Sequence, residues 1–243
     1  MSSHELYRDD YYLVEAYGEM GHATSVVGFS WRDGSFDPLR PKDFSRSFLN
    51  EGMARWPVEA NWISIITSRN CWYLHDQVEP AIEVIARAVE GTRTITCGSS
   101  MGGYAAINWG KALESDYAFA ISPLATLFDP FMAAIRDVRF PLDRRLLPQE
   151  RDSVLRGDQS ELRGLIAFDD LDSRDIQHAA AIMENTKVEA LRVPRAGHPC
   201  GGALRRVYPL RRILESIIRD SFDTVAVQQE VLEKLALENG DPA

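Results

Sequence analysis

A serine between two glycines follows a short apolar run near the middle of the 243-residue chain. The segment reads Gly98-Ser99-Ser100-Met101-Gly102 and fits the pattern G-x-S-x-G. It lies between residues that predict a strand and an alanine-rich stretch that predicts a helix. A sharp turn in this position lifts the Ser100 hydroxyl above the end of a sheet, and the flanking glycines relieve the crowding that the turn creates. The segment therefore predicts a nucleophile at Ser100.

A serine hydroxyl needs a base to accept its proton and a carboxylate to orient that base. Of the five histidines in the chain, we select His198 as the base. It lies directly after the last predicted strand, between Gly197 and Pro199, which permit an unusual backbone. A loop at this edge of a sheet can reach the serine, so His198 is the predicted general base.

The acid is expected in a loop that carries four aspartates after the penultimate predicted strand. We select Asp172, because it lies far enough beyond the strand for the loop to turn toward His198. Asp169 and Asp170 are nearer to the strand and are expected to cap or brace the loop. Asp175 stays open as an alternative acid, and equally as the N-cap of the next helix. With the serine, this choice gives the chain order nucleophile, acid, base, which is the order of the α/β-hydrolases.

The tetrahedral intermediate of acyl transfer needs two N–H donors, one after the nucleophile and one after an early strand. Met101 supplies the first of these donors. The second is expected from Trp31, or from Ser30 just before it, at the end of an apolar run. Trp31 could equally be a core-packing side chain. The predicted oxyanion hole therefore consists of Met101 with Trp31 or Ser30.

These loops must meet at one edge of a sheet, and the sequence predicts such a sheet. Short β-rich runs alternate with segments of helical periodicity, which is typical of an α/β fold with a parallel sheet. The expected strands are residues 11–16, 24–30, 62–67, 94–97, 117–121, 164–168 and 188–193. The expected helices are residues 42–55, 77–90, the stretch after the Ser100 turn, residues 175–184 and those from 202 onward.

Residues 127–163 interrupt this alternation with three prolines and short helical pieces. We expect them to form a small cap insertion, or lid, within a single domain that spans residues 1–243. The insertion holds seven arginines and seven acidic residues. This balance favours a solvated charged lid over a set of arginines that bind an anionic substrate.

Composition narrows the class of partner. The net charge of −9 excludes a nucleic-acid binder and disfavours an acidic membrane surface. It also makes a neutral acyl substrate the simpler expectation, because an anionic one would need a local arginine cluster acting against the overall field. The C-terminal helices could pair with a second copy in a homodimer, or simply close the sheet.

The remaining composition predicts a cytoplasmic protein. No apolar run is long enough to span a bilayer, and the first residues do not resemble a signal peptide. The three cysteines are widely spaced, so we expect free thiols and no zinc site. No metal and no organic cofactor is expected.

The chain resembles the α/β-hydrolase-fold superfamily from the strand before Phe29 to the helix after His198, most specifically in GSSMGGYAA, in the Asp172 loop and in AGHP. The stretch SMGGYAAINWGKAL, with WYLHD upstream, is similar to a bacterial subgroup of mostly uncharacterised hydrolases, some of them associated with surface-polysaccharide loci. The resemblance implies a mostly parallel central sheet flanked by helices, with a short cap insertion. Phe29 and Ser30 stand where the family usually has His-Gly.

The leading functional hypothesis is a serine hydrolase that cleaves an ester or thioester through an acyl-Ser100 intermediate. An acyltransferase that uses the same triad is an alternative, in which an alcohol or amine replaces water. A non-catalytic binding or scaffold protein that keeps the hydrolase fold is a second alternative, suggested by the departure from His-Gly.

Overall fold

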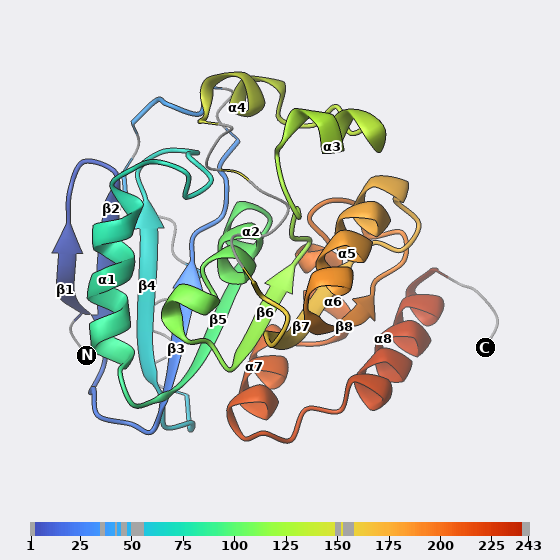
Figure 1. Cartoon of the computed structure of the whole chain (residues 1–243). Helices are drawn as coiled ribbons and strands as arrows, with labels where there is room; N and C mark the ends of the chain where they lie inside the picture. Colours follow the sequence, from blue (N-terminus) through green and yellow to red (C-terminus); the bar gives the residue numbers. More distant parts are fainter. Residues whose placement is uncertain are drawn as a thin grey trace.

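The computed structural model describes residues 3–34, 37–41, 43–44, 48–49, 56–148, 152 and 158–239, and one eight-stranded sheet lies at their centre (Figure 1). The strand order is β1-β2-β4-β3-β5-β6-β7-β8. The strands are β1 (Ser3–Arg8), β2 (Tyr12–Tyr17), β3 (Thr24–Phe29), β4 (Asn61–Thr67), β5 (Arg93–Ser99), β6 (Tyr117–Ile121), β7 (Arg163–Phe168) and β8 (Lys187–Arg192).

The helices follow the strands in alternation from β4 onward. They are α1 (Val78–Val89), α2 (Met101–Asn108), α3 (Asp129–Ala134), α4 (Pro141–Leu146), α5 (Ser173–Asn185), α6 (Gly201–Val207), α7 (Leu210–Ile218) and α8 (Thr224–Asn239), with a short 3-10 helix, η2 (Lys111–Leu113).

The predicted mostly parallel sheet is confirmed. Strands β4, β3, β5, β6, β7 and β8 run parallel, while β2 pairs antiparallel with β4 and with β1. Every residue of β4 is buried, as expected for a parallel strand covered on both faces. The sequence did not predict β1, because its mixed polar residues carry no buried pattern at this edge of the sheet.

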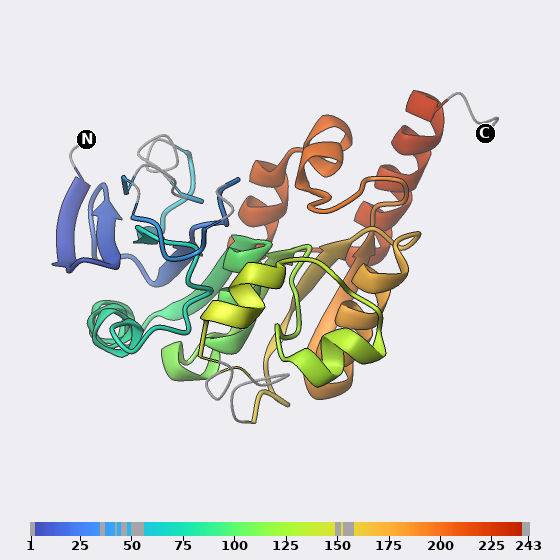
Figure 2. The same cartoon turned by 90° about the horizontal axis from the view of Figure 1, so that it is seen from above.

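Helices cover both faces of the sheet (Figure 2). Alternate side chains of β6 show the division, because Ala118 and Ala120 pack toward α5, whereas Phe119 and Ile121 pack toward α6, α7 and α8. Helices α1 and α2 lie on the same face as α5. Three layers with the sheet in the middle therefore hold the strand ends in fixed positions.

The segment between β6 and β7 contains α3 and α4, which lie above the carboxyl ends of the strands (Figure 1). Buried Asp152 ties this segment to the layer beneath, because it accepts hydrogen bonds from the Tyr104 hydroxyl at 3.0 Å and the Leu127 amide at 2.5 Å. Burial raises the pKa of Asp152 to about 6, although these hydrogen bonds act in the opposite direction. Most of the helix predicted at residues 42–55 lies outside the described residues.

Two glycines allow α2 to approach the strands at backbone contact. A Cβ at Gly98 would lie 2.3 Å from the backbone of Gly102, and a Cβ at Gly102 would lie 2.3 Å from the carbonyl oxygen of Phe29. Neither contact can be relieved by a side-chain rotation. The G-x-S-x-G pattern therefore sets the distance between α2 and the ends of β3 and β5.

Gly102→Ala is expected to lower the free energy of unfolding by about 1–3 kcal/mol, because the new methyl group forces α2 away from β3. Gly202 on α6 is the matched control, since a Cβ there meets no atom within 4 Å. Gly202→Ala is expected to leave stability unchanged or raise it by up to about 1 kcal/mol. Urea unfolding followed by circular dichroism measures both variants, and equal stability of the two would contradict the packing argument.

Candidate active site

Ser100 occupies the turn between β5 and α2 in a strained backbone conformation. Its φ of 52° and ψ of −113° lie in a region that a residue with a Cβ rarely adopts. Its amide donates to the Ile121 carbonyl at 2.8 Å, and its own carbonyl accepts from Tyr104 at 2.9 Å. The side chain is 7% exposed. These bonds on both sides hold the hydroxyl at the carboxyl end of the sheet.

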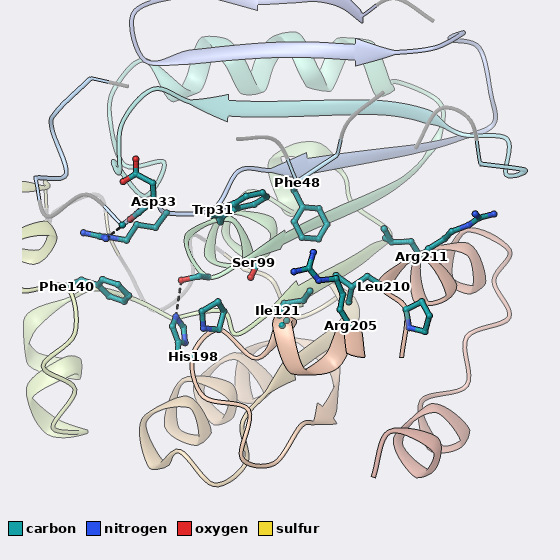
Figure 3. A pocket seen from close by; sticks show the side chains of 18 of the residues that line it. Trp31, Asp33, Phe48, Ser99, Ile121, Phe140, His198, Arg205, Leu210 and Arg211 are labelled. Atoms are coloured by element: carbon teal, nitrogen blue, oxygen red, sulfur yellow. Dashed lines mark hydrogen bonds between the residues drawn. The ribbon is translucent and has the colours of Figure 1, made fainter. Parts of the chain in front are cut away.

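His198 lies beside this hydroxyl, with Nε2 3.0 Å from the Ser100 Oγ (Figure 3). Asp169 fixes the loop that presents the imidazole. It accepts hydrogen bonds from the amides of Gly197 at 2.7 Å and Arg195 at 3.1 Å, and also braces its own loop through Leu171 at 2.9 Å. The structure therefore brings the expected nucleophile and base together.

Asp175, and not Asp172, contacts the imidazole. The Asp175 carboxylate lies 3.3 Å from Nδ1 of His198 and is 3% exposed. Asp172 is the N-cap of α5, where it accepts from the Arg174 amide at 2.9 Å and pairs with the Arg174 guanidinium at 2.6 Å. The residue beside the imidazole is therefore Asp175, the alternative acid that the sequence left open, while Asp172, the acid selected from the sequence, takes the N-cap position.

Helical periodicity explains why Asp175, and not Asp172, lies beside His198. Asp175 lies on the buried stripe of α5 with His178, Ala179 and Ile182, which follow it at intervals of three, four and seven residues. Asp172 precedes the first turn and caps it, so its carboxylate is held by the helix backbone and by Arg174. These contacts, the side-chain bond from Arg174 above all, lower the pKa of Asp172 to about 2. The spacing was visible in the sequence and would have identified Asp175.

Arg139, from the segment between α3 and α4, is a partner of Asp175 that sequence reasoning missed. Its Nη1 donates to Asp175 at 2.6 Å, and its Nη2 pairs with Asp137 at 2.6 Å. Burial acts to raise the pKa of Asp175, but the hydrogen bond from His198 and the charges of His198 and Arg139 together lower it. Asp175 is therefore held as a carboxylate in a buried position.

The chain of contacts continues to a second histidine. The Asp137 carboxylate lies 3.2 Å from Nε2 of His178, which is fully buried. Nδ1 of His178 accepts a hydrogen bond from the Ala125 amide at 3.0 Å, so the neutral ring carries its proton on Nε2 and donates it to Asp137. Burial lowers the pKa of His178. His178 therefore helps to hold Asp137 in position, and it does not compete with His198 for the serine.

Ser30 is not free to bind an oxyanion. Its amide donates to the Ile65 carbonyl at 3.1 Å, and its hydroxyl pairs with Tyr73 and accepts from Thr67. Trp31 is 36% exposed and lines the cavity, so it is not a core-packing residue. Met101 is the first residue of α2, and its amide therefore has no partner within the helix. The amides of Met101 and Trp31 remain the two candidate donors.

The loop that carries Trp31 is fastened to the insertion. Arg32 donates two hydrogen bonds to Asp143 on α4, at 2.8 and 3.0 Å. Asp143 is fully buried and also accepts from Nε1 of Trp72 at 2.7 Å. Because a buried bidentate pair of this kind fixes both partners in orientation, Arg32 holds the Trp31 loop in place over the site.

Ser100 and His198 open into a cavity of about 800 Å³ (Figure 3). Its walls are largely apolar and come from the loop after β3, the ends of β5 and β6, the insertion, the loop that carries His198, and helices α6 and α7. The lining residues are Trp31, Arg32, Asp33, Gly34, Phe48, Trp56, Ser99, Ser100, Ile121, Phe140, His198, Pro199, Gly201, Gly202, Arg205, Pro209, Leu210, Arg211 and Leu214.

The part of the chain that the structure describes has neither a metal-binding cluster nor a membrane-spanning helix. Within it, no three His, Cys, Asp or Glu side chains form a group that could hold a metal ion. Within the same residues, no helix combines the length and the apolar character needed to cross a bilayer. Cys71, Cys97 and Cys200 are buried and form no disulfide bond.

The sequence matches no family model, and no curated protein matches it. Solved structures do resemble it. The capsule O-acetyltransferase of Neisseria meningitidis serogroup A is 13% identical, with a TM-score of 0.56 over 88% of this chain and 93% of that one. Brefeldin A esterase, described as a bacterial homologue of human hormone-sensitive lipase, is 14% identical, with a TM-score of 0.53 over 95% of this chain and 76% of that one.

A third neighbour is EstE7, a homologue of hormone-sensitive lipase from a metagenome library. It is 16% identical, with a TM-score of 0.54 over 89% of this chain and 82% of its own. At these identities the likeness concerns the fold alone. Together with the strand order and the helices on both faces of the sheet, it shows that this chain has the α/β-hydrolase fold.

Proposed function

We propose that this protein is a serine hydrolase that cleaves a carboxylic ester or thioester through an acyl-Ser100 intermediate. The observation that supports the proposal is the hydrogen-bonded row Ser100, His198, Asp175 at the mouth of a largely apolar cavity. Ser100 lies in a strained turn, His198 in a loop held by Asp169, and Asp175 in the buried first turn of α5.

In the first step, Oγ of Ser100 attacks the substrate carbonyl carbon while Nε2 of His198 accepts the hydroxyl proton. This step requires the neutral imidazole to carry its proton on Nδ1, facing Asp175. The buried carboxylate favours that tautomer and stabilises the imidazolium that forms. Arg139 keeps Asp175 charged without reaching the reacting atoms.

The attack places a negative charge on the former carbonyl oxygen, where the amides of Met101 and Trp31 would donate hydrogen bonds. When the intermediate collapses, the bond to the leaving oxygen or sulfur breaks, and His198 donates its proton to that atom. Water then attacks the acyl-Ser100 carbonyl, His198 accepts a proton from it, and the acid is released with the serine regenerated.

The segment between β6 and β7 would act as the cap of this site. It contributes Phe140 to the cavity wall, and the Phe140 ring lies 6.2 Å from the imidazole of His198 between centroids. It also contributes Arg139 and Asp143, which fix the acid and the Trp31 loop. The cap is therefore part of the catalytic framework and not only a cover.

Acyl transfer to an alcohol is the second candidate. One neighbour of similar fold is a capsule O-acetyltransferase, and the sequence resembles a subgroup with members at surface-polysaccharide loci. The chemistry up to acyl-Ser100 would be identical, with an acceptor hydroxyl in place of water. Product analysis with competing alcohols separates the two candidates. A scaffold without turnover is less well supported, because it would need neither the strained serine nor its hydrogen bond to His198.

A fluorophosphonate probe is expected to label the wild-type protein at the Ser100 hydroxyl, because His198 activates this group for attack on phosphorus. Ser100→Ala should abolish labelling, and Ser221→Ala, an exposed serine outside the site, should not reduce it. In-gel fluorescence followed by peptide mass spectrometry measures both. Unlabelled wild-type protein would count against the proposed function.

Asp175→Asn is expected to lower kcat for ester hydrolysis by about 10⁴-fold, because the imidazole loses the carboxylate that sets its tautomer. Asp172→Asn is the matched control, since asparagine is also a good N-cap, and activity should stay close to that of the wild type. Initial rates with a p-nitrophenyl ester, with circular dichroism of both variants, make the comparison. A larger loss in Asp172→Asn would overturn the assignment of Asp175.

A further inference from the structure

We propose that Arg205 binds an anionic group, a carboxylate or a phosphate, on the molecule that occupies the Ser100 cavity. If the proposed function holds, that molecule is an ester or thioester substrate that carries a negative charge. The proposal differs from the neutral substrate that the composition favoured, and it depends on the charges that line the cavity.

The cavity lining is positive although the chain as a whole carries a net charge of −9. Among the residues that the structure describes, Arg32, Arg205 and Arg211 line it, together with one acidic residue, Asp33. Two of the arginines are occupied. Arg32 forms its bidentate pair with Asp143, whereas Arg211 pairs with Glu215 at 2.7 Å and lies over the Trp56 ring.

Arg205 differs from the other two arginines of the lining. In the described part of the chain, no carboxylate, carbonyl oxygen or aromatic ring forms a hydrogen bond, ion pair or cation–π contact with its guanidinium. Figure 3 shows the guanidinium directed into the cavity, between Phe48 and Ile121 in this view. An arginine that reaches into a cavity with no partner has five N–H donors available for a ligand.

The position of Arg205 is set by the same loop that presents the base. Helix α6 begins at Gly201, three residues after His198, and Arg205 lies one turn farther along it. A Cβ at Gly201 would lie 3.2 Å from the Ile121 side chain, so α6 packs closely against the end of β6. An anion held by Arg205 would therefore lie in the same cavity as the Ser100 hydroxyl and at a fixed place relative to it.

Apolar residues and the planar shape of the guanidinium define the contact that Arg205 can make. Phe48, Ile121, Leu210 and Leu214 line the cavity with apolar surface. Arg205 itself is exposed to solvent, so these apolar side chains flank the guanidinium without removing it from water, and recognition of an anion rests on the hydrogen bonds that the guanidinium can donate. The planar guanidinium can donate two parallel hydrogen bonds to a carboxylate or phosphate, and Arg205 is free to do so.

The arginines of the insertion do not supply this contact. Arg139 is paired with Asp137 and Asp175, and Arg144 with Asp129. Among the insertion residues that the structure describes, no arginine lines the cavity. The local basic group that an anionic substrate would require therefore comes from α6 and not from the cap.

Two matched substrate pairs test the proposal by kinetics. Mono-p-nitrophenyl glutarate is compared with p-nitrophenyl pentanoate, which replaces the terminal carboxylate by a methyl group. S-acetyl phosphopantetheine is compared with S-acetyl pantetheine, which lacks the phosphate. In Arg205→Gln, the ratio of kcat/KM for the charged over the neutral member should fall about tenfold to hundredfold in at least one pair. The pair that responds identifies carboxylate or phosphate as the anion.

Arg206→Gln is the control for the change in net charge. Arg206 is the next residue of α6, is exposed, pairs with Glu238 and does not line the cavity. The charge ratio in this variant should equal that of the wild type. An equal fall in both variants would show a general effect of charge and would overturn the assignment to Arg205.

Binding to Ser100→Ala separates this proposal from the proposed function. Calorimetry with monoethyl glutarate and with phosphopantetheine is expected to show binding of one of them, weakened about tenfold or more by adding Arg205→Gln. Such binding without turnover of any ester by the wild type would reject the hydrolase and keep the anion site. Arg205 carries no such site if neither compound binds, or if Arg205→Gln changes neither the affinities nor the charge ratios.

Discussion

The buried ion pair between Arg139 and Asp175 is the interaction on which the rest of the site depends. A carboxylate beneath an imidazole must be charged to orient it, yet burial of an unpaired carboxylate is strongly unfavourable. Nη1 of Arg139 lies 2.6 Å from Oδ1 of Asp175 and supplies the positive charge that a buried carboxylate needs. Asp175 also lies in the first turn of α5, where the positive end of the helix dipole stabilises a negative charge. Asp175 can then remain ionised in a place where water does not solvate it.

The same interaction gives the insertion between β6 and β7 a structural role. Three of its charged residues, Asp137, Arg139 and Asp143, form ion pairs that join the insertion to α5 and to the loop after β3. One pair fixes Asp175 beside His198, and the other fixes the loop that carries Trp31. Loss of the insertion would therefore remove the ion pairs that position Asp175 and the Trp31 loop. Polar contacts of this kind specify one arrangement more strongly than apolar packing would.

The sequence was sufficient for the fold and for two of the three residues in the row. Apolar runs buried on both faces identify the parallel strands, and the glycine pattern with its strand and helix identifies Ser100. A loop after the last strand identifies His198. For the third, Asp172 was preferred and Asp175 kept as the alternative, because distance along the loop was weighed above the period of α5, which places Asp175 on the buried stripe and Asp172 at the N-cap.

Long-range partners could not be read from the sequence in the same way. Arg139 and Asp175 are 36 residues apart, and Arg32 and Asp143 are 111 residues apart, so no local pattern connects them. Ser30 failed as an oxyanion donor for a similar reason, since its amide is occupied by Ile65 on the neighbouring strand. Arg205 stands out only through the structure, because the other two arginines of the cavity lining are paired with Asp143 and Glu215.

Detection of the covalent intermediate tests the central claim most directly. The protein is mixed with p-nitrophenyl acetate, quenched in acid during the first turnover and analysed by intact and peptide mass spectrometry. The account predicts one added acetyl group on the peptide that contains Ser100, formed with a burst of p-nitrophenol and absent in His198→Ala. Acetylation of another residue, or an undiminished burst in His198→Ala, would contradict it.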